Sequence, residues 1–302
     1  MDFRDSPDEA AFRERLRSWL SLHAKEFASS GDDYWARQAE WHQALYREGF
    51  FGLSWPREYG GQELAPVYDV IVDEELARAG APPRPSVGYL IYGIGRHASD
   101  ELRRRFLPGI INGTERWCQG FSEPGAGSDL ASLTTTARLE GDTYVVDGHK
   151  IWTSYSDVAD WCLLLARTDP QAKRHRGLSA FILEMKQPGV QQRPLRMING
   201  VTNEFGQVFF DGAKVPADRM VGAPRGRVGG GHDGGRARTR ALHAGVCGSL
   251  RQDRPQPLRA HRRPGVRGIG LGGSAIGDAH ASRPATAVRA AGRRVARARG
   301  IA

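Results

Sequence analysis

The sequence predicts an α+β multidomain chain, with an all-helical region over residues 1–115 followed by a small β-barrel or β-sandwich domain over residues 116–222. Apolar residues recur at helical spacing in the first region, whereas short β-prone segments alternate with Gly, Pro and Asn turns in the second. Residues 223–302 contain 17 Arg, 16 Gly and no aromatic residue. Because such a tail lacks the large side chains whose burial offsets chain entropy, we expect it to be disordered.

The expected helices have recognisable first and last residues. Ser6 is suited to be the N-cap of the first helix, and Pro7 to occupy its first position. We expect this helix to end near residue 30, and its buried stripe to be Phe12, Leu16, Trp19, Leu20, His23 and Phe27. Further helices are expected at residues 34–48, 67–79, 87–98 and 100–106, the last closed by the Pro-Gly pair at 108–109.

The expected strands begin with residues 144–152, where Asp147-Gly148 is typical of the tight turn of a β-hairpin. Further strands are expected at residues 161–166, 178–183, 190–195 and 207–210. On this interpretation His149 is an ordinary hairpin side chain. Residues 174–176, Arg-His-Arg, form a solvated loop, with contact to a CoA phosphate as the alternative. The Glu pair at 74–75 is expected on a helix surface, with proton acceptance as its alternative.

Composition and charge exclude several classes of protein. The three cysteines are too scattered for a disulfide framework or a zinc cluster, and the nine histidines show no metal-ligand spacing. No apolar run approaches the roughly 18–20 residues needed to span a bilayer. The polar start shows no signal peptide, so we expect a cytoplasmic protein without a metal site.

The net charge is unevenly distributed, since residues 223–302 carry +14 and residues 1–222 carry −5. Clustered Arg attracts phosphate, so an Arg-rich binder of nucleic acid or of an anionic surface is one alternative for the function. The tail has no aromatic residue, no fold motif and no amphipathic stripe, which disfavours that alternative. We therefore expect neither nucleic acid nor a membrane span.

The densest group of chemically useful residues is the segment 117–130, Trp-Cys-Gln-Gly-Phe-Ser-Glu-Pro-Gly-Ala-Gly-Ser-Asp-Leu. Its glycines, proline and small hydroxyl residues can present backbone amides to an electron-rich ligand, which makes the segment a candidate cofactor cradle. Neither a Walker A sequence nor G-x-G-x-x-G in its strand-turn-helix context is present. Ser122 and Ser128 are poor candidates for a hydrolase nucleophile, because neither lies in G-x-S-x-G.

Residues 121–129, Phe-Ser-Glu-Pro-Gly-Ala-Gly-Ser-Asp, resemble the signature of the acyl-CoA dehydrogenase family. The resemblance extends back to Trp-Pro-Arg-Glu-Tyr-Gly-Gly at 55–61 and forward to Lys-Ile-Trp-Thr-Ser at 150–154 and to residues 208–216. It covers residues 1–222. It implies an N-terminal helical domain, a middle β domain and a C-terminal four-helix bundle.

The resemblance also implies that FAD lies along these segments. Phe121 and Ser122 are expected at the pyrimidine and N5 side of the flavin, and Ser154 stands near N5, where the family commonly has Thr. Trp152 is expected to pack on the flavin, although without the resemblance it is equally well a core aromatic. The expected cofactor-binding residues are Gln119, Phe121, Ser122, Ser128, Trp152, Thr153 and Ser154, and Ser128 is also the expected substrate-binding residue.

The reaction implied by the resemblance is α,β-dehydrogenation of an acyl-CoA thioester. A carboxylate removes the α proton while the β hydride passes to FAD. The implied partners are an acyl-CoA substrate, an electron-transfer flavoprotein or similar acceptor, and identical subunits that assemble through the bundle. The family's base is a Glu of that bundle. Residues 223–302 contain no Glu, so we assign no catalytic base, and assembly through the bundle is not expected of this chain.

The resemblance stops near residue 222, where the bundle should begin. Residues 231–257 can be back-translated, with freely chosen codons, so that the frame displaced by one nucleotide reads VGTMAVGHERGPSTRVFAARYGKTVRSL. This string is similar to the family's first bundle helix. We therefore interpret the tail as the product of a frameshift or sequencing error near codons 223–230, which would leave the flavin site open on one side and the enzyme defective. The other interpretations are a non-catalytic partner subunit of a heteromeric dehydrogenase, an acyl-CoA oxidase and a flavin monooxygenase.

Overall fold

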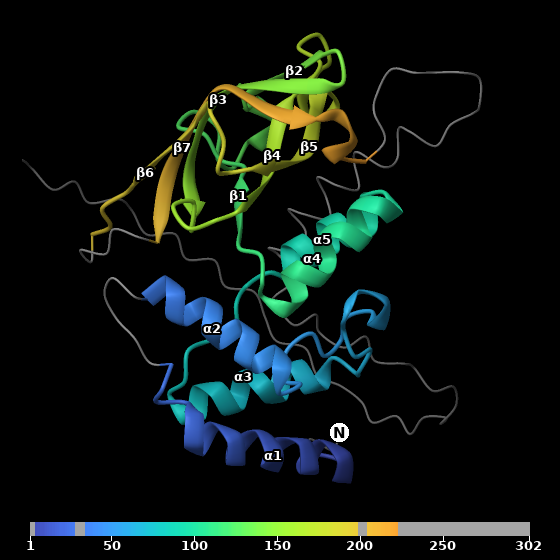
Figure 1. Cartoon of the computed structure of the whole chain (residues 1–302), viewed down its shortest axis with the longest axis vertical. Helices are drawn as coiled ribbons and strands as arrows, with labels where there is room; N and C mark the ends of the chain where they lie inside the picture. Colours follow the sequence, from blue (N-terminus) through green and yellow to red (C-terminus); the bar gives the residue numbers. More distant parts are fainter. Residues whose placement is uncertain (1–3, 28–33, 199–203, 223–302) are drawn as a thin grey trace, which may run out of the picture. The chain divides into compact units, whose positions relative to one another are not determined.

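The computed structural model describes residues 4–27, 34–198 and 204–222, so the predictions for the tail lie outside the described residues (Figure 1). Up to residue 112 the described chain is helical, as the sequence predicts, and no strand occurs there. Its elements are α1 (Pro7–His23), α2 (Tyr34–Arg47), the 3₁₀ turn η1 (Arg57–Tyr59), α3 (Val67–Ala79), α4 (Gly88–His97) and α5 (Asp100–Asn112).

Two helix ends differ from the prediction. Helix α1 begins as expected, with the Ser6 side chain accepting from the Glu9 backbone N–H, but it ends at His23 rather than near residue 30. Helix α5 continues through Pro108 to Asn112 instead of stopping before it. A proline inside a helix removes one hydrogen bond. Buried Phe106, Leu107, Ile110 and Ile111 on both sides of it keep the helix packed.

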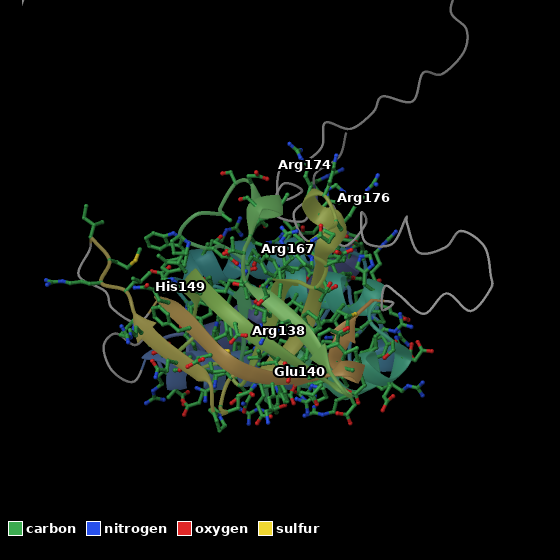
Figure 2. All side chains as sticks on the ribbon, turned by 90° about the horizontal axis from the view of Figure 1, so that it is seen from above. Arg138, Glu140, His149, Arg167, Arg174 and Arg176 are labelled. Atoms are coloured by element: carbon green, nitrogen blue, oxygen red, sulfur yellow. The ribbon has the colours of Figure 1, made fainter. Side chains whose placement is uncertain are left out.

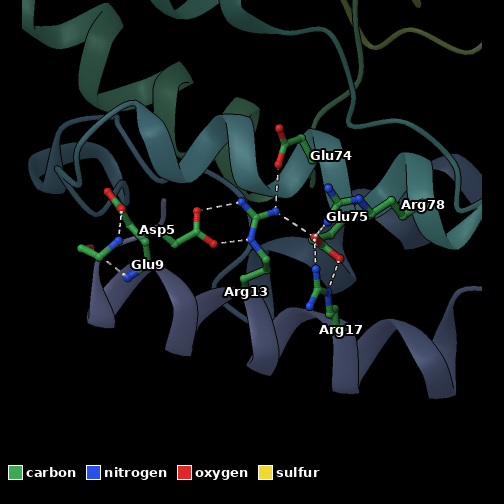
Figure 3. Close-up of polar contacts among 8 residues, drawn as sticks. Asp5, Glu9, Arg13, Arg17, Glu74, Glu75 and Arg78 are labelled. Carbon is green, nitrogen blue, oxygen red and sulfur yellow. Dashed lines mark hydrogen bonds and ion pairs between the residues drawn. The ribbon is translucent and has the colours of Figure 1, made fainter. Parts of the chain in front are cut away.

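An ion network holds α1 against α3, and it corrects the prediction for the Glu pair (Figure 3). Glu74 is about half exposed, but the Glu75 side chain is only 3% exposed. Glu75 accepts from Arg13 at 2.8 Å, from Arg17 at 2.7 Å and from Arg78 at 2.7 Å. Three guanidinium groups from two helices therefore satisfy one buried carboxylate, which makes Glu75 a structural residue.

Within the described residues, eight strands form one sheet in the order β6-β7-β3-β2-β4-β5-β8, with β1 added as a parallel neighbour of β4. The strands are β1 (Trp117–Gly120), β2 (Thr136–Glu140), β3 (Thr143–Ser154), β4 (Trp161–Arg167), β5 (Leu178–Glu184), β6 (Val190–Pro194), β7 (Phe205–Pro216) and β8 (Met220–Val221). The rings of Tyr144 on β3 and Phe181 on β5 lie 4.8 Å apart, although these strands are not neighbours in the sheet. The sheet therefore curls around a core, which confirms the predicted barrel-like or sandwich-like domain.

Strand β4 separates two hydrophobic cores. Cys162, Leu164 and Ala166 belong to the core enclosed by the curled sheet. Trp161, Leu163 and Leu165 belong to a second core shared with α4 and α5. Because side chains alternate along a strand, a strand that is buried on both faces reads as the continuous apolar run seen at residues 161–166.

The predicted hairpin turn at Asp147-Gly148 is wrong. Strand β3 passes straight through these residues, and the turn lies instead between β2 and β3, where Gly141 has φ 66°. At Gly148 the pairing of β3 with β7 shifts register. A Cβ at Gly148 would stand 2.7 Å from the Cα of Thr135. Position 148 needs glycine because another backbone segment approaches closely at this β-bulge. Glycine is typical of bulges as well as of tight turns.

Candidate functional site

The glycine-rich loop leaves β1 and ends at the 3₁₀ turn η2 (Leu130–Ser132). Its tip is a tight turn in which Glu123 and Ala126 exchange two backbone hydrogen bonds, of 2.8 and 3.0 Å. A Cβ added at Gly125 or at Gly127 would meet nothing within 4 Å, and neither residue has a left-handed φ. The described fold therefore does not itself require glycine at these two positions. They leave open space over the loop backbone, as a cradle for a ligand would.

Buried polar atoms without a hydrogen-bond partner lie on the two strands next to this loop. Among the described residues they include Gln119 Oε1 on β1 and Thr153 Oγ1 on β3, and the Thr153 residue is 0% exposed. Buried polar atoms are nearly always paired in folded proteins, so such groups are a sign of a missing ligand or water. Both belong to the residues for which the sequence predicted cofactor contact.

A β-bulge in β3 sets the directions of the remaining predicted residues. Lys150 pairs with Val208 and Thr153 with Gly206, so β3 has one residue more than β7 between these pairs. The extra residue allows both Lys150 and Thr153 to be buried, although in a regular strand residues three apart face opposite sides. Trp152 takes a φ of 58° and is 55% exposed, with its ring 6.4 Å from that of Phe205. A bulky residue at positive φ is strained, which is typical of functional sites.

The structure brings the loop and the second half of β3 together. The backbone N–H of Ile151 donates to the carbonyl of Ser122 at 2.9 Å, which joins the loop to the residue before Trp152. Phe121 is buried, Ser122 and Ser154 are half-buried, and Ser128 is exposed on the loop. No hydrogen bond among the described residues joins Ser128 to residues 152–154. Its predicted contacts with phosphate or substrate therefore stay a prediction.

The sequence interpretation missed a buried ion pair under this loop. Lys150 Nζ donates to Glu123 Oε1 at 2.8 Å and to the Phe121 carbonyl at 3.0 Å, and the Lys150 side chain is 0% exposed. Glu123 also accepts from the backbone of Thr134 at 2.6 Å, the Thr134 hydroxyl at 2.7 Å and the backbone of Thr135 at 2.8 Å. A charged residue in the middle of a β-prone run was the available signal, but its acidic partner lies 27 residues away in the chain.

Burial and charge act in opposite directions on this pair. Burial raises the pKa of Glu123, but the charge of Lys150 and hydrogen bonds to the carboxylate outweigh it and lower the pKa to about 2. Burial also lowers the pKa of Lys150, and the negative charge of Glu123 opposes that shift. Because the carboxylate and the ammonium group are 2.8 Å apart, each supplies the counter-charge that the other needs.

The other polar groups that the sequence singled out have structural partners or are exposed. His149 shares a 2.9 Å hydrogen bond with Gln207 and stacks on Phe209. Arg174 and Arg176 lie on the η3 turn (Arg174–Gly177) and point outward, as the solvated-loop interpretation predicts (Figure 2). Within the described ranges, no group of three His, Cys, Asp or Glu residues could hold a metal ion. None of the helices described is long and apolar enough to cross a membrane.

The described chain combines a helical region and a curled sheet with an open glycine loop beside unpaired buried polar groups, an arrangement that fits a protein with a ligand site at the sheet. The model for the N-terminal domain of acyl-CoA dehydrogenases matches residues 6–114, and the model for the middle domain of acyl-CoA dehydrogenases matches residues 118–213. The chain belongs to the acyl-CoA dehydrogenase family.

Individual relatives agree with this assignment. The chain is 44% identical over 232 residues to acyl-CoA dehydrogenase IpdE1 of Mycobacterium tuberculosis, an alignment that covers 72% of this chain and 59% of that protein. The ChsE4-ChsE5 complex from the same organism is similar with a TM-score of 0.68 and 32% identity, covering 83% of this chain and 61% of that one. For the Tcur3481-Tcur3483 steroid ACAD the TM-score is 0.65 and the identity 30%, covering 84% and 67%. The chain thus spans about three fifths of the length of IpdE1.

Proposed function

We propose that this chain binds FAD against β1, the glycine loop and β3, and that it takes part in the α,β-dehydrogenation of an acyl-CoA thioester. The observation that carries the proposal is the pair of unpartnered buried atoms, Gln119 Oε1 and Thr153 Oγ1, next to the open loop. A flavin ring has an N–H edge and several ring nitrogen and oxygen acceptors. An amide oxygen and a hydroxyl are the groups suited to pair with it.

Four residues of the chain have distinct roles in the proposed binding of FAD. Gln119 and Thr153 supply the two hydrogen-bonding groups from the buried side, and the half-buried Ser122 hydroxyl supplies a third. The bulge leaves the Trp152 side chain exposed, and in this proposal its ring packs on one face of the flavin ring. FAD supplies the hydride-accepting chemistry when it is bound. Donors fixed around an electron-rich ring stabilise its reduced form, because they need no reorganisation when charge develops.

The substrate and the electron acceptor follow from the family rather than from a described pocket. We propose an acyl-CoA thioester as substrate, with Ser128 at the exposed end of the loop as its contact, and an electron-transfer flavoprotein or similar protein as acceptor. The steroid named for the Tcur3481-Tcur3483 relative makes a polycyclic acyl-CoA one candidate among short and long acyl chains.

A titration of the purified chain with FAD tests the proposal. We expect a bound flavin absorption band, and we expect bleaching by an acyl-CoA thioester once a catalytic carboxylate is supplied by this chain or by a partner. Thr153→Val removes the hydroxyl with little change of shape and should weaken FAD binding about tenfold. Thr168→Val is the matched control, because the Thr168 hydroxyl pairs with Ser179 at 2.8 Å on another part of the sheet. A chain that binds no FAD contradicts the proposal.

A second candidate function is that of a non-catalytic subunit in a heteromeric dehydrogenase. It is supported by the names of the ChsE4-ChsE5 and Tcur3481-Tcur3483 relatives, each of which joins two proteins. The resemblance places the family base on a Glu of the bundle, a role that no Glu of residues 1–302 was assigned. Co-expression with a relative that carries this Glu should then yield a mixed complex with dehydrogenase activity that neither protein has alone. Oxygen consumption without another electron acceptor would indicate an oxidase or a monooxygenase instead.

A further inference from the structure

We propose that the buried pair Lys150–Glu123 is a positioning device, which fixes the Phe121–Ser122 peptide so that the N–H and hydroxyl of Ser122 face the flavin. This inference rests on the proposed FAD site. It assigns a role to two residues that do not themselves contact the cofactor.

Contacts from β3 hold two successive peptide groups of the loop, Phe121–Ser122 and Ser122–Glu123. The Lys150 ammonium group donates to the Phe121 carbonyl at 3.0 Å, and the backbone N–H of the next residue, Ile151, donates to the Ser122 carbonyl at 2.9 Å. Two successive carbonyls of the loop are therefore held by two successive residues of β3. The direction of the loop backbone is fixed relative to the strand that also carries Trp152.

Because the peptide bond is planar and trans, these contacts also fix the direction of the Ser122 N–H. The described chain has no cis peptide bond, and in a trans peptide the C=O and N–H groups point in opposite directions. With the Phe121 carbonyl held against Lys150, the N–H of Ser122 has to point away from the buried ammonium group. No hydrogen bond is found for this N–H among the described residues, so it is available to an acceptor on a ligand.

Glu123 is the second part of the device. It neutralises Lys150 and ties the start of the turn to Thr134 and Thr135 on the far side of the loop, through three further hydrogen bonds. A buried ion pair gives little net stability compared with apolar residues of similar volume. A purely stabilising role is therefore a weak explanation for a charged pair at this position. An ammonium group can hold a specific carbonyl, whereas an apolar side chain cannot.

The test uses the double variant Glu123→Gln/Lys150→Met in the full chain. Lys150→Met alone would leave a buried unpaired carboxylate and could fail to fold, whereas the double change removes both charges and keeps the volume. The matched control is Glu75→Gln, which alters another buried carboxylate, at the α1–α3 contact and away from the loop. The readouts are the FAD dissociation constant, the flavin midpoint potential, and amide hydrogen exchange of residues 123 and 126 without FAD, whose N–H groups are hydrogen-bonded across the turn.

We expect the double variant to fold, to bind FAD at least tenfold more weakly than the unaltered chain, and to give a more negative midpoint potential. Exchange at residues 123 and 126 should be faster, whereas Glu75→Gln should change none of these readouts. A double variant that binds FAD with unchanged affinity and potential overturns the inference and leaves the proposed function standing. One that does not fold, judged by circular dichroism, also overturns it, because the pair then serves folding. If the unaltered chain binds no FAD, the proposed function fails, and the inference fails with it.

Discussion

At the scale of single residues, His42 on α2 predicts how stability depends on pH. It is 7% exposed, its ring lies 4.3 Å from that of Phe51, and its Nε2 is 3.1 Å from the Ile111 carbonyl. Burial lowers the pKa of His42 to about 4, against a smaller opposing effect of the Ile111 hydrogen bond. Folding therefore favours the neutral ring, and the unfolded chain takes up a proton first as the pH falls.

The expected result is a loss of stability between the unfolded pKa of His42, near 6.5, and its folded pKa, near 4. Its contribution is fully present above pH 6.5 and falls by on the order of 3 kcal/mol on acidification to pH 4. Urea denaturation of the FAD-free chain at pH 7, 5.5 and 4 measures this change. His42→Gln cannot titrate, so its free energy of unfolding should fall less over the same interval. Parallel pH profiles for the two proteins would exclude His42 as the cause.

At the scale of elements, the bulge in β3 contains a residue, Trp152, whose replacement should weaken FAD binding with little change in the stability of the fold. Trp152 has a φ of 58° and is 55% exposed. Replacement by glycine removes the strain of a side chain at positive φ, about 1–2 kcal/mol. It also raises the conformational entropy of the unfolded chain, which costs a similar free energy on folding. Trp152→Gly should therefore change the free energy of unfolding by less than about 1 kcal/mol, since the two effects offset each other. The same variant should weaken FAD binding at least tenfold, because the aromatic surface is lost.

Trp152→Phe is the matched control, since it keeps a ring at the strained position and should retain most of the affinity. Thermal unfolding and FAD titration of the two variants measure both effects. A large loss of stability in Trp152→Gly would show that Trp152 is an ordinary packing residue, as a reading of the bare sequence allowed.

The helices and strands with a strong apolar pattern were predicted, because periodicity records which face is buried. The Asp147-Gly148 turn was wrong, because the same dipeptide suits a bulge when another segment, here Thr135, approaches the glycine. The end of α5 was placed too early, since packing by Ile110 and Ile111 outweighs the hydrogen bond lost at Pro108.

The candidate site was predicted in part for the same physical reason. The loop at 121–129 was found because its glycines and its family signature are local in the sequence. The Lys150–Glu123 pair and the triple pairing of Glu75 were not found. Burial of a charge depends on partners that only the fold brings near, such as Arg13 and Arg17 for Glu75. A sequence pattern indicates which residues prefer water, but it does not indicate which charged residues will form an ion pair in the protein interior.

At the scale of the whole described molecule, the helical region and the sheet share a core, which predicts that they unfold together. Phe106 on α5 is 2% exposed, and its ring lies edge-on to Trp117 at 5.5 Å and to Trp161 at 5.0 Å. Both tryptophans belong to the sheet, on β1 and β4. A helix residue therefore packs against side chains of two neighbouring strands. Loss of its ring should weaken both regions at once.

Phe106→Ala should lower the free energy of unfolding by about 3–5 kcal/mol, because it removes a buried ring and leaves a cavity. Phe106→Leu should cost less than about 2 kcal/mol, since most of the volume remains. Tyr92→Ala on α4, where the side chain is 63% exposed, should change stability by less than about 0.5 kcal/mol. Amide hydrogen exchange of β4 and β5 at increasing denaturant concentration reports the sheet, and circular dichroism at 222 nm reports the helices. The two should give coincident transitions in all of these proteins. If Phe106→Ala lost helical signal at a lower denaturant concentration than protection of β4 and β5, the two regions would be separate folding units that do not unfold cooperatively.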